Sequence, residues 1–130
     1  MKQLITLILI LAGSNSFSQC KVCFSLEEAK IAPYEVEELH LSNASFTIID
    51  SSFNRFILLQ VLDLSYNPVM EVSETVSIPS LRALNLSNCS YNPWKIGAIG
   101  KAFPKLENLN LSSNQLSFIW SGLQRCTSPI

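Results

Sequence analysis

The stretch LQVLDLSYN, residues 59–67, decides the fold of this chain. Three other segments repeat its form, L-x-x-L-x-L-x-x-N/C, with small departures: VEELHLSNA at 36–44, LRALNLSNC at 81–89 and LENLNLSSN at 106–114. The leucine at the fourth place of the template is Leu39, Leu62, Leu84 or Leu109, so the copies recur after 23, 22 and 25 residues. Self-similarity at periods of this length indicates a chain built from stacked repeats.

Each template copy predicts one short strand. The two leucines of L-x-L project from one face of the strand, and the residue between them faces water. At the ninth place the chain turns away, where a buried Asn67 or Asn114 can hydrogen-bond unpaired backbone groups. Cys89 replaces this asparagine once, and Ala44 can make no such bond, so we expect the Ala44 turn to be looser.

The segment SFNRFILLQVLDLS, residues 52–65, resembles the F-x-x-L-x-x-L-x-x-L-x-L-S run of extracellular leucine-rich-repeat proteins. Toll-like receptor ectodomains and insect adhesion proteins have this pattern, and the resemblance covers residues 36–130. It implies an α/β-type repeat solenoid: a short horseshoe arc with a parallel concave sheet of about four strands and a mostly irregular convex side.

We expect the chain of 130 residues to divide into a signal peptide at 1–18, an N-terminal cap at 19–35 and four repeats, with no C-terminal cap. The repeats span 36–58, 59–80, 81–105 and 106–130. Lys2, an apolar run over 4–12 and the small residues Ser16 and Ser18 follow the pattern of a secretory signal. The run is shorter than the roughly 20 residues that cross a membrane, so we expect a secreted protein without a transmembrane segment.

The charge balance argues against polyanionic partners. Nine lysines and arginines against ten acidic residues give a net charge of −1. A chain with so little net charge has no electrostatic field that would attract nucleic acid or an anionic membrane. No cofactor is expected.

Cys20 and Cys23 favour a small disulfide over a metal or redox site in a secreted protein. Extracellular family members have cysteine-rich N-terminal caps, although their longer pattern carries cysteines that this chain lacks between Cys23 and Cys89. Zinc would need about four ligands, and only His40, Cys89 and Cys126 remain, dispersed along the repeats. We therefore predict no metal site, and a buried, inert thiol at Cys89.

The C-terminal end carries two open alternatives. The family's C-terminal cap would begin near Cys126, which looks partnerless in an exposed tail. Apolar area should remain at this end, which indicates an interface; the residues concerned are Leu109, Leu111, Leu116 and Ile119. One alternative is a free-standing module that self-associates or docks a partner here, with a possible homodimer through this end or through Cys126. The other is a structural or self-associating fragment of a longer receptor ectodomain.

Solvent-facing strand residues form the predicted binding surface on the concave face. Amides and hydroxyls dominate it, which suits hydrogen-bonding recognition of an extracellular protein or glycan better than uptake of a lipid. Tyr66 and Arg82 are the expected anchors. The alternative is that most of these residues are merely solvated. The candidate ligand-binding residues are Glu38, His40, Asp63, Tyr66, Arg82, Asn85, Asn108 and Asn110.

Four N-x-S/T acceptors, at Asn43, Asn85, Asn88 and Asn110, are candidates for N-glycosylation. Asn85 and Asn110 lie inside the repeated L-N-L-S, so these two acceptors are either glycan sites or by-products of the template. If glycosylated, they would cover the centre of the concave face and move ligand binding to its edges or to the convex side.

No enzyme is predicted. His40 and Asp63 occupy the same template place in adjacent repeats, about 4.8 Å apart in a parallel sheet, with Ser65 nearby. A hydrolytic triad would also need a nucleophile elbow or an oxyanion-forming turn, and no motif for either accompanies these residues. A surface ion pair accounts for them. The expected function is recognition by binding, in innate immunity or cell adhesion as the resemblance implies.

Overall fold

The computed structural model describes residues 20–69, 71–92 and 95–114. The predicted signal peptide at 1–18 lies outside the described residues, as do Leu116, Ile119 and Cys126. Within the described part, no helix is long and apolar enough to cross a membrane.

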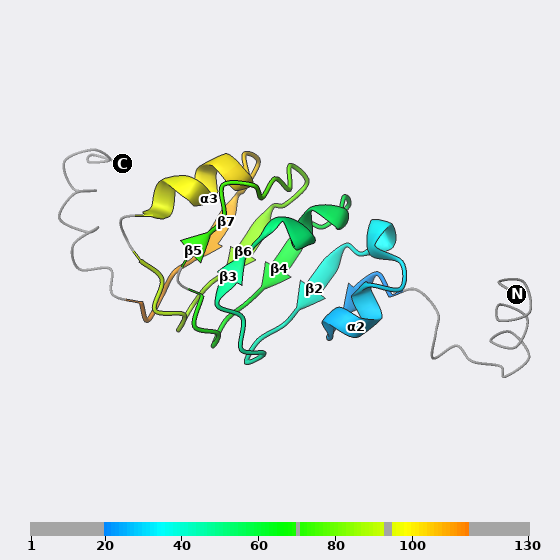
Figure 1. Cartoon of the computed structure of the whole chain (residues 1–130), viewed down its shortest axis with the longest axis horizontal. Helices are drawn as coiled ribbons and strands as arrows, with labels where there is room; N and C mark the ends of the chain where they lie inside the picture. Colours follow the sequence, from blue (N-terminus) through cyan, green and yellow to red (C-terminus); the bar gives the residue numbers. More distant parts are fainter. Residues whose placement is uncertain (1–19, 70, 93–94, 115–130) are drawn as a thin grey trace, which may run out of the picture.

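A five-stranded parallel sheet organises the described chain (Figure 1). Its strands lie in the order β1-β2-β4-β6-β7, so each repeat adds its strand beside the strand of the repeat before. The bounds are Val22–Cys23 for β1, Glu38–His40 for β2, Val61–Asp63 for β4, Ala83–Asn85 for β6 and Asn108–Asn110 for β7. The template leucines are in register from Leu39 to Leu62, Leu84 and Leu109.

The sheet has five strands where about four were expected, because the N-terminal cap contributes β1. The carbonyl of Lys21 accepts hydrogen bonds from the amides of Glu37 and Glu38, at 2.8 and 2.9 Å. The edge of β2 is thereby paired instead of open to solvent, which is what a repeat array needs at its end. The parallel sheet and its register fit a repeat fold, and the horseshoe arc stays a prediction.

The opposite side of the repeats is more regular than the sequence predicted. Strands β3 (Ile48–Ile49) and β5 (Glu71–Val72) form a second, two-stranded parallel sheet. The 3-10 helix η3 (Ser51–Arg55) follows β3, and helix α3 (Ile96–Ala102) contacts β5. Asp50 begins η3 by accepting a 2.9 Å hydrogen bond from the amide of Ser52. Short ordered elements therefore replace the irregular chain that was expected there.

One apolar core lies between these two layers. The sheet supplies the template leucines, and Leu62, Leu64 and Leu86 are fully buried. The second layer supplies branched and aromatic side chains that pack against them. These include Ile49, Phe53, Phe56, Val72, Val76, Ile78, Ile99 and Phe103. Leu109, in β7, is 38% exposed.

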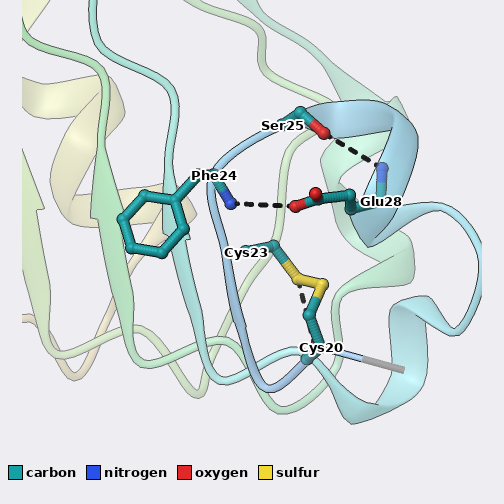
Figure 2. Close-up of a disulfide and its surroundings, with 5 residues drawn as sticks. All are labelled: Cys20, Cys23, Phe24, Ser25 and Glu28. Atoms are coloured by element: carbon teal, nitrogen blue, oxygen red, sulfur yellow. Dashed lines mark hydrogen bonds between the residues drawn. A yellow bond between two sulfur atoms is a disulfide. The ribbon is translucent and has the colours of Figure 1, made fainter. Parts of the chain in front are cut away.

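The N-terminal cap consists of β1, helix α2 (Leu26–Ala29) and the 3-10 helix η2 (Pro33–Glu35). Figure 2 shows the predicted disulfide between Cys20 and Cys23 beside α2. Ser25 caps the helix by accepting a 3.2 Å hydrogen bond from the amide of Glu28, and the Glu28 carboxylate accepts one of 3.4 Å from the amide of Phe24. This reciprocal pair satisfies amides that the short helix leaves free.

The ninth template residue holds the turn of the repeat before its own. Asn67 is 1% exposed; its Oδ1 accepts from the amides of Ala44 and Phe46, and its Nδ2 donates to the carbonyl of Leu41. Our expectation of a loose turn at Ala44 is therefore corrected, because the following repeat supplies the missing hydrogen bonds. Cys89 donates its thiol to the carbonyl of Leu64 at 3.0 Å and so takes the place of an asparagine, as predicted.

Candidate functional site

The solvent side of the five-stranded sheet, called the sheet face below, consists of two rows of side chains. They come from the third and fifth template places, because these alternate with the buried leucine at the fourth. The third places align Glu38, Val61, Ala83 and Asn108, with Val22 of β1 beside Glu38. The fifth places align His40, Asp63, Asn85 and Asn110. One row is thus half apolar and the other polar.

An open hollow of about 410 Å³ lies on this face over β4, β6 and β7. It brings together five of the predicted ligand-binding residues: His40, Asp63, Asn85, Asn108 and Asn110. Val61 and Ala83, which the strand alternation also places on the solvent side, line it too, although they were not among the candidate ligand-binding residues. Both stand at third template places, between residues 60 and 62 and between residues 82 and 84.

His40 is held from three sides at one end of this hollow. Its Nε2 lies 3.2 Å from Oε2 of Glu38, and its Nδ1 lies 4.0 Å from Oδ2 of Asp63. The ring of Phe24 stacks on the imidazole, with centroids 5.3 Å apart and an angle of 20° between the planes. Glu38, another predicted ligand-binding residue, is thereby connected to the hollow through His40. Phe24 follows β1 in the cap, where the repeat template could not indicate it.

The fifth-place side chains also fix the turns behind their own strands. Oδ1 of Asp63, Asn85 and Asn110 accepts a hydrogen bond from the amide two residues on, at 2.9, 3.0 and 3.0 Å. Each side chain is held in one orientation by this contact. Within the described residues, the second oxygen of Asp63 faces His40, and the NH2 groups of the two asparagines remain as donors for a ligand.

The two predicted anchors lie away from the hollow. Arg82 pairs with Glu107 at 2.9 Å, just before the strands begin. Tyr66 is 64% exposed in the turn after β4, with a backbone φ of 57°. Asn43 and Asn88, two of the four glycosylation candidates, occupy the same left-handed turn place, with φ of 54° and 55°. Tyr66 and these asparagines therefore mark the carboxyl-terminal edge of the strands.

Two serines at the seventh template place, those of the second and third copies, are buried. Ser65 is 6% exposed and Ser87 is 7% exposed, whereas Ser42 and Ser112, at the same place of the first and fourth copies, are exposed. Asp63 accepts a hydrogen bond from the backbone amide of Ser65, which is a turn contact and not the geometry of a catalytic nucleophile. Over the described ranges, no group of three or more His, Cys, Asp or Glu side chains is arranged to hold a metal ion.

The comparison with known families identifies the repeat. A model of the leucine-rich repeat matches residues 105–126, which contain the fourth template copy and strand β7. No curated protein matches the chain. The matched strand is in register with those of the other three copies. Repeats of this kind typically bind other proteins and are not catalytic, and the match together with the repeated parallel strands supports a leucine-rich-repeat protein.

Proposed function

We propose that this chain is a secreted binding module that recognises an extracellular protein or glycan through the sheet face. The observation that carries the proposal is the hollow over β4, β6 and β7, where fixed amide and carboxylate groups lie beside the apolar side chains of Val61 and Ala83. The resemblance of the repeats to receptor and adhesion proteins supports a role in innate immune recognition or cell adhesion.

The polar row suits a ligand with its own hydroxyl or amide groups. Asp63 accepts hydrogen bonds, and the NH2 groups of Asn85 and Asn110 donate them. Because their turn contacts already fix these side chains, a ligand loses less conformational entropy in ordering them. The adjacent apolar surface accommodates a methyl group, a ring face or the carbon face of a sugar.

The shape favours an extended ligand. The hollow is open along three adjacent strands and does not enclose a small molecule, so a peptide segment or an oligosaccharide chain laid across the strands would contact one polar group per repeat. A protein partner could present such a segment from a loop.

The first experiment is a binding screen against purified extracellular proteins and a glycan array. An Ala83→Arg variant places a long charged side chain in the hollow and leaves every turn hydrogen bond in place. The matched control is Ser77→Arg, an exposed position on the second layer that adds the same charge. We expect Ala83→Arg to weaken binding about tenfold or more, a loss of roughly 1.4 kcal/mol, and the control to bind normally. Equal binding by both variants would place the ligand elsewhere.

Secretion is tested separately, by the intact mass of the protein released by its own cells. Cleavage after Ser18 would give a chain that starts at Gln19, and glycosidase treatment would report any occupied N-x-S/T acceptor. Retention of the whole chain inside the cell would remove the extracellular part of the proposal. A glycan on Asn85 or Asn110 would move the ligand search to the edges of the sheet face or to the opposite layer.

A further inference from the structure

Four equivalent turns lead into strands β2, β4, β6 and β7. In each turn an amide donates to the carbonyl three residues earlier: Val36 to Pro33 at 3.4 Å, and at 3.1 Å Leu59 to Phe56, Leu81 to Ile78 and Leu106 to Phe103. The two central residues of each turn are exposed or half-buried. They are Tyr34 and Glu35, Ile57 and Leu58, Pro79 and Ser80, and Pro104 and Lys105.

The first central residues form an exposed apolar row, called the turn row below: Tyr34, Ile57, Pro79 and Pro104. Tyr34 is 55% exposed and Ile57 is 62% exposed, and beside them Leu58 is 48% exposed. Pro79 and Pro104 fit this place because a proline presets the backbone angle that it requires. An exposed apolar row of this kind on a protein surface is a candidate interaction site.

The turns lie in a regular series because the backbone just after them is hydrogen-bonded from repeat to repeat. The amide of Gln60 donates to the carbonyl of Glu37, that of Arg82 to Gln60 and that of Glu107 to Arg82, at 2.7 to 2.8 Å. Ser80 adds a 2.7 Å hydrogen bond to the carbonyl of Leu59. Adjacent turns are therefore spaced like the strands, about 4.8 Å apart.

Opposite charges flank the two ends of the turn row. Glu35 stands beside Tyr34 at one end, and Lys105 stands beside Pro104 at the other. Among the described residues neither has an ion-pair partner. The row is thus self-complementary. If a second copy runs antiparallel to the first, Glu35 of each chain meets Lys105 of the other, and Ile57 lies next to the two-fold axis, opposite Pro79.

We propose that the turn row is a docking surface for a second copy of this chain, in a two-fold symmetric dimer with the rows antiparallel. A two-fold contact uses the same patch on both subunits, so the patch must complement itself when reversed. The turn row meets this requirement because it has an acidic end, an apolar middle and a basic end. The four glycosylation candidates do not obstruct it, since they lie on the sheet face or in the turns after the strands. This proposal does not depend on the ligand of the sheet face.

The proposed contact is small, so the dimer should be weak. Four turns at about 4.8 Å cover less than the roughly 800 Å² per partner of a standard stable interface. Sedimentation of the full chain over a wide concentration range should therefore show a reversible equilibrium between monomer and dimer. A monomer at every concentration would overturn the proposal.

The apolar part of the contact is tested with Ile57→Asp. Ile57 is 62% exposed, so the variant should fold normally, as its circular dichroism would verify. We expect the dissociation constant to rise about tenfold or more. The matched control is Tyr66→Asp, since Tyr66 is 64% exposed at the opposite end of β4 and its left-handed backbone tolerates Asp. A dimer that survives Ile57→Asp, or one that is lost only with reductant, would contradict the assigned surface.

Charge reversal tests the antiparallel arrangement. At low ionic strength, Glu35→Lys and Lys105→Glu should each weaken the dimer because like charges then meet at both ends. The double variant should restore it, and an equimolar mixture of the two single variants should form a heterodimer. Failure of both restorations would refute the antiparallel contact even if the chain dimerises.

Discussion

Oδ1 of Asn67 accepts a 2.7 Å hydrogen bond from the amide of Ala44, which lies 23 residues earlier in the chain. Ala44 occupies the ninth place of the first template copy and has no polar side chain. Its turn nevertheless donates two amide hydrogen bonds to Asn67, from Ala44 and Phe46, just as the amides of Cys89 and Tyr91 donate to Asn114. An asparagine at the ninth place therefore stabilises the turn of the preceding repeat as well as its own.

Replacing Asn67 by alanine should destabilise the protein strongly. The change leaves buried backbone groups of two repeats without partners, among them the amides of Ala44 and Phe46 and the carbonyls of Leu41 and Leu64. We expect the free energy of unfolding to fall by on the order of 3 kcal/mol in urea titrations. Asn114→Ala should cost less because Asn114 is only partly buried. An Asn67→Ala variant as stable as the parent would refute this role.

Cys89→Asn should stabilise the protein. The Cys89 sulfur lies against the carbonyls of Leu64 and Ser87 and near the amides of Asn67 and Val69, the groups that an asparagine binds in the other turns. A thiol makes only weak hydrogen bonds, so we expect a gain of about 1 kcal/mol in thermal or urea unfolding. Cys89→Ala is the comparison and should lose stability. If both variants lose it equally, the turn cannot accommodate the larger amide.

Alkaline pH should destabilise the fold through Tyr91. Burial, with a smaller contribution from the charge of Glu71, raises the pKa of Tyr91 from its ordinary 10.0 to about 12. The unfolded chain loses this proton first, so the stabilisation is complete below pH 10.0 and declines as pH rises towards about 12. Burial also raises the pKa of the Cys89 thiol above its ordinary 9.0, which adds a decline that begins at lower pH.

Tyr91→Phe separates these two contributions. The variant should lose about 1 kcal/mol near neutral pH, because the tyrosine hydroxyl donates a 2.8 Å hydrogen bond to the carbonyl of Lys95. Above pH 10.0 its stability should fall less steeply than that of the parent. Urea unfolding at a series of pH values measures both effects, and parallel curves would show that Tyr91 does not cause the decline.

Reduction of the Cys20–Cys23 disulfide should lower the free energy of unfolding by about 2 kcal/mol, the chain-entropy value for so short a loop. In the folded state, reduction should loosen the chain only around β1. Amide hydrogen exchange should therefore accelerate at Glu37 and Glu38, whose amides donate to Lys21. A Cys20→Ala/Cys23→Ala variant should show the same exchange with or without reductant. Unchanged exchange in the reduced parent protein would mean that β1 holds without the disulfide.

The template leucines predict the strands, their parallel register and most of the core, because a period-2 alternation leaves one arrangement that buries Leu39, Leu62 and Leu84 together. The fifth strand was missed because β1 contains Val22 and Cys23 in place of the template leucines. Its place is set by pairing with β2, which a search for the repeat pattern does not register.

The sequence predicted only part of the candidate site, for a similar reason. His40, Asp63 and Asn85 face solvent because they stand between two buried template leucines. Ser65 has the same sequence signature of a polar residue beside leucine, but it follows the end of β4 and is buried, which the pattern does not indicate because Ser42, at the same template place, is exposed. Phe24 comes from the cap and reaches His40 only through the three-dimensional fold.

Because the ninth-place residue hydrogen-bonds the turn of the preceding repeat, it also sets the order in which the turns form during protein synthesis. A chain is made from its N-terminus and begins to fold as it grows. The amide of Ala44 cannot find its acceptor until Asn67, 23 residues later, has been added. Each turn is thus completed one repeat late, and the turn that contains Asn43 lacks these hydrogen bonds until the second template copy has been made.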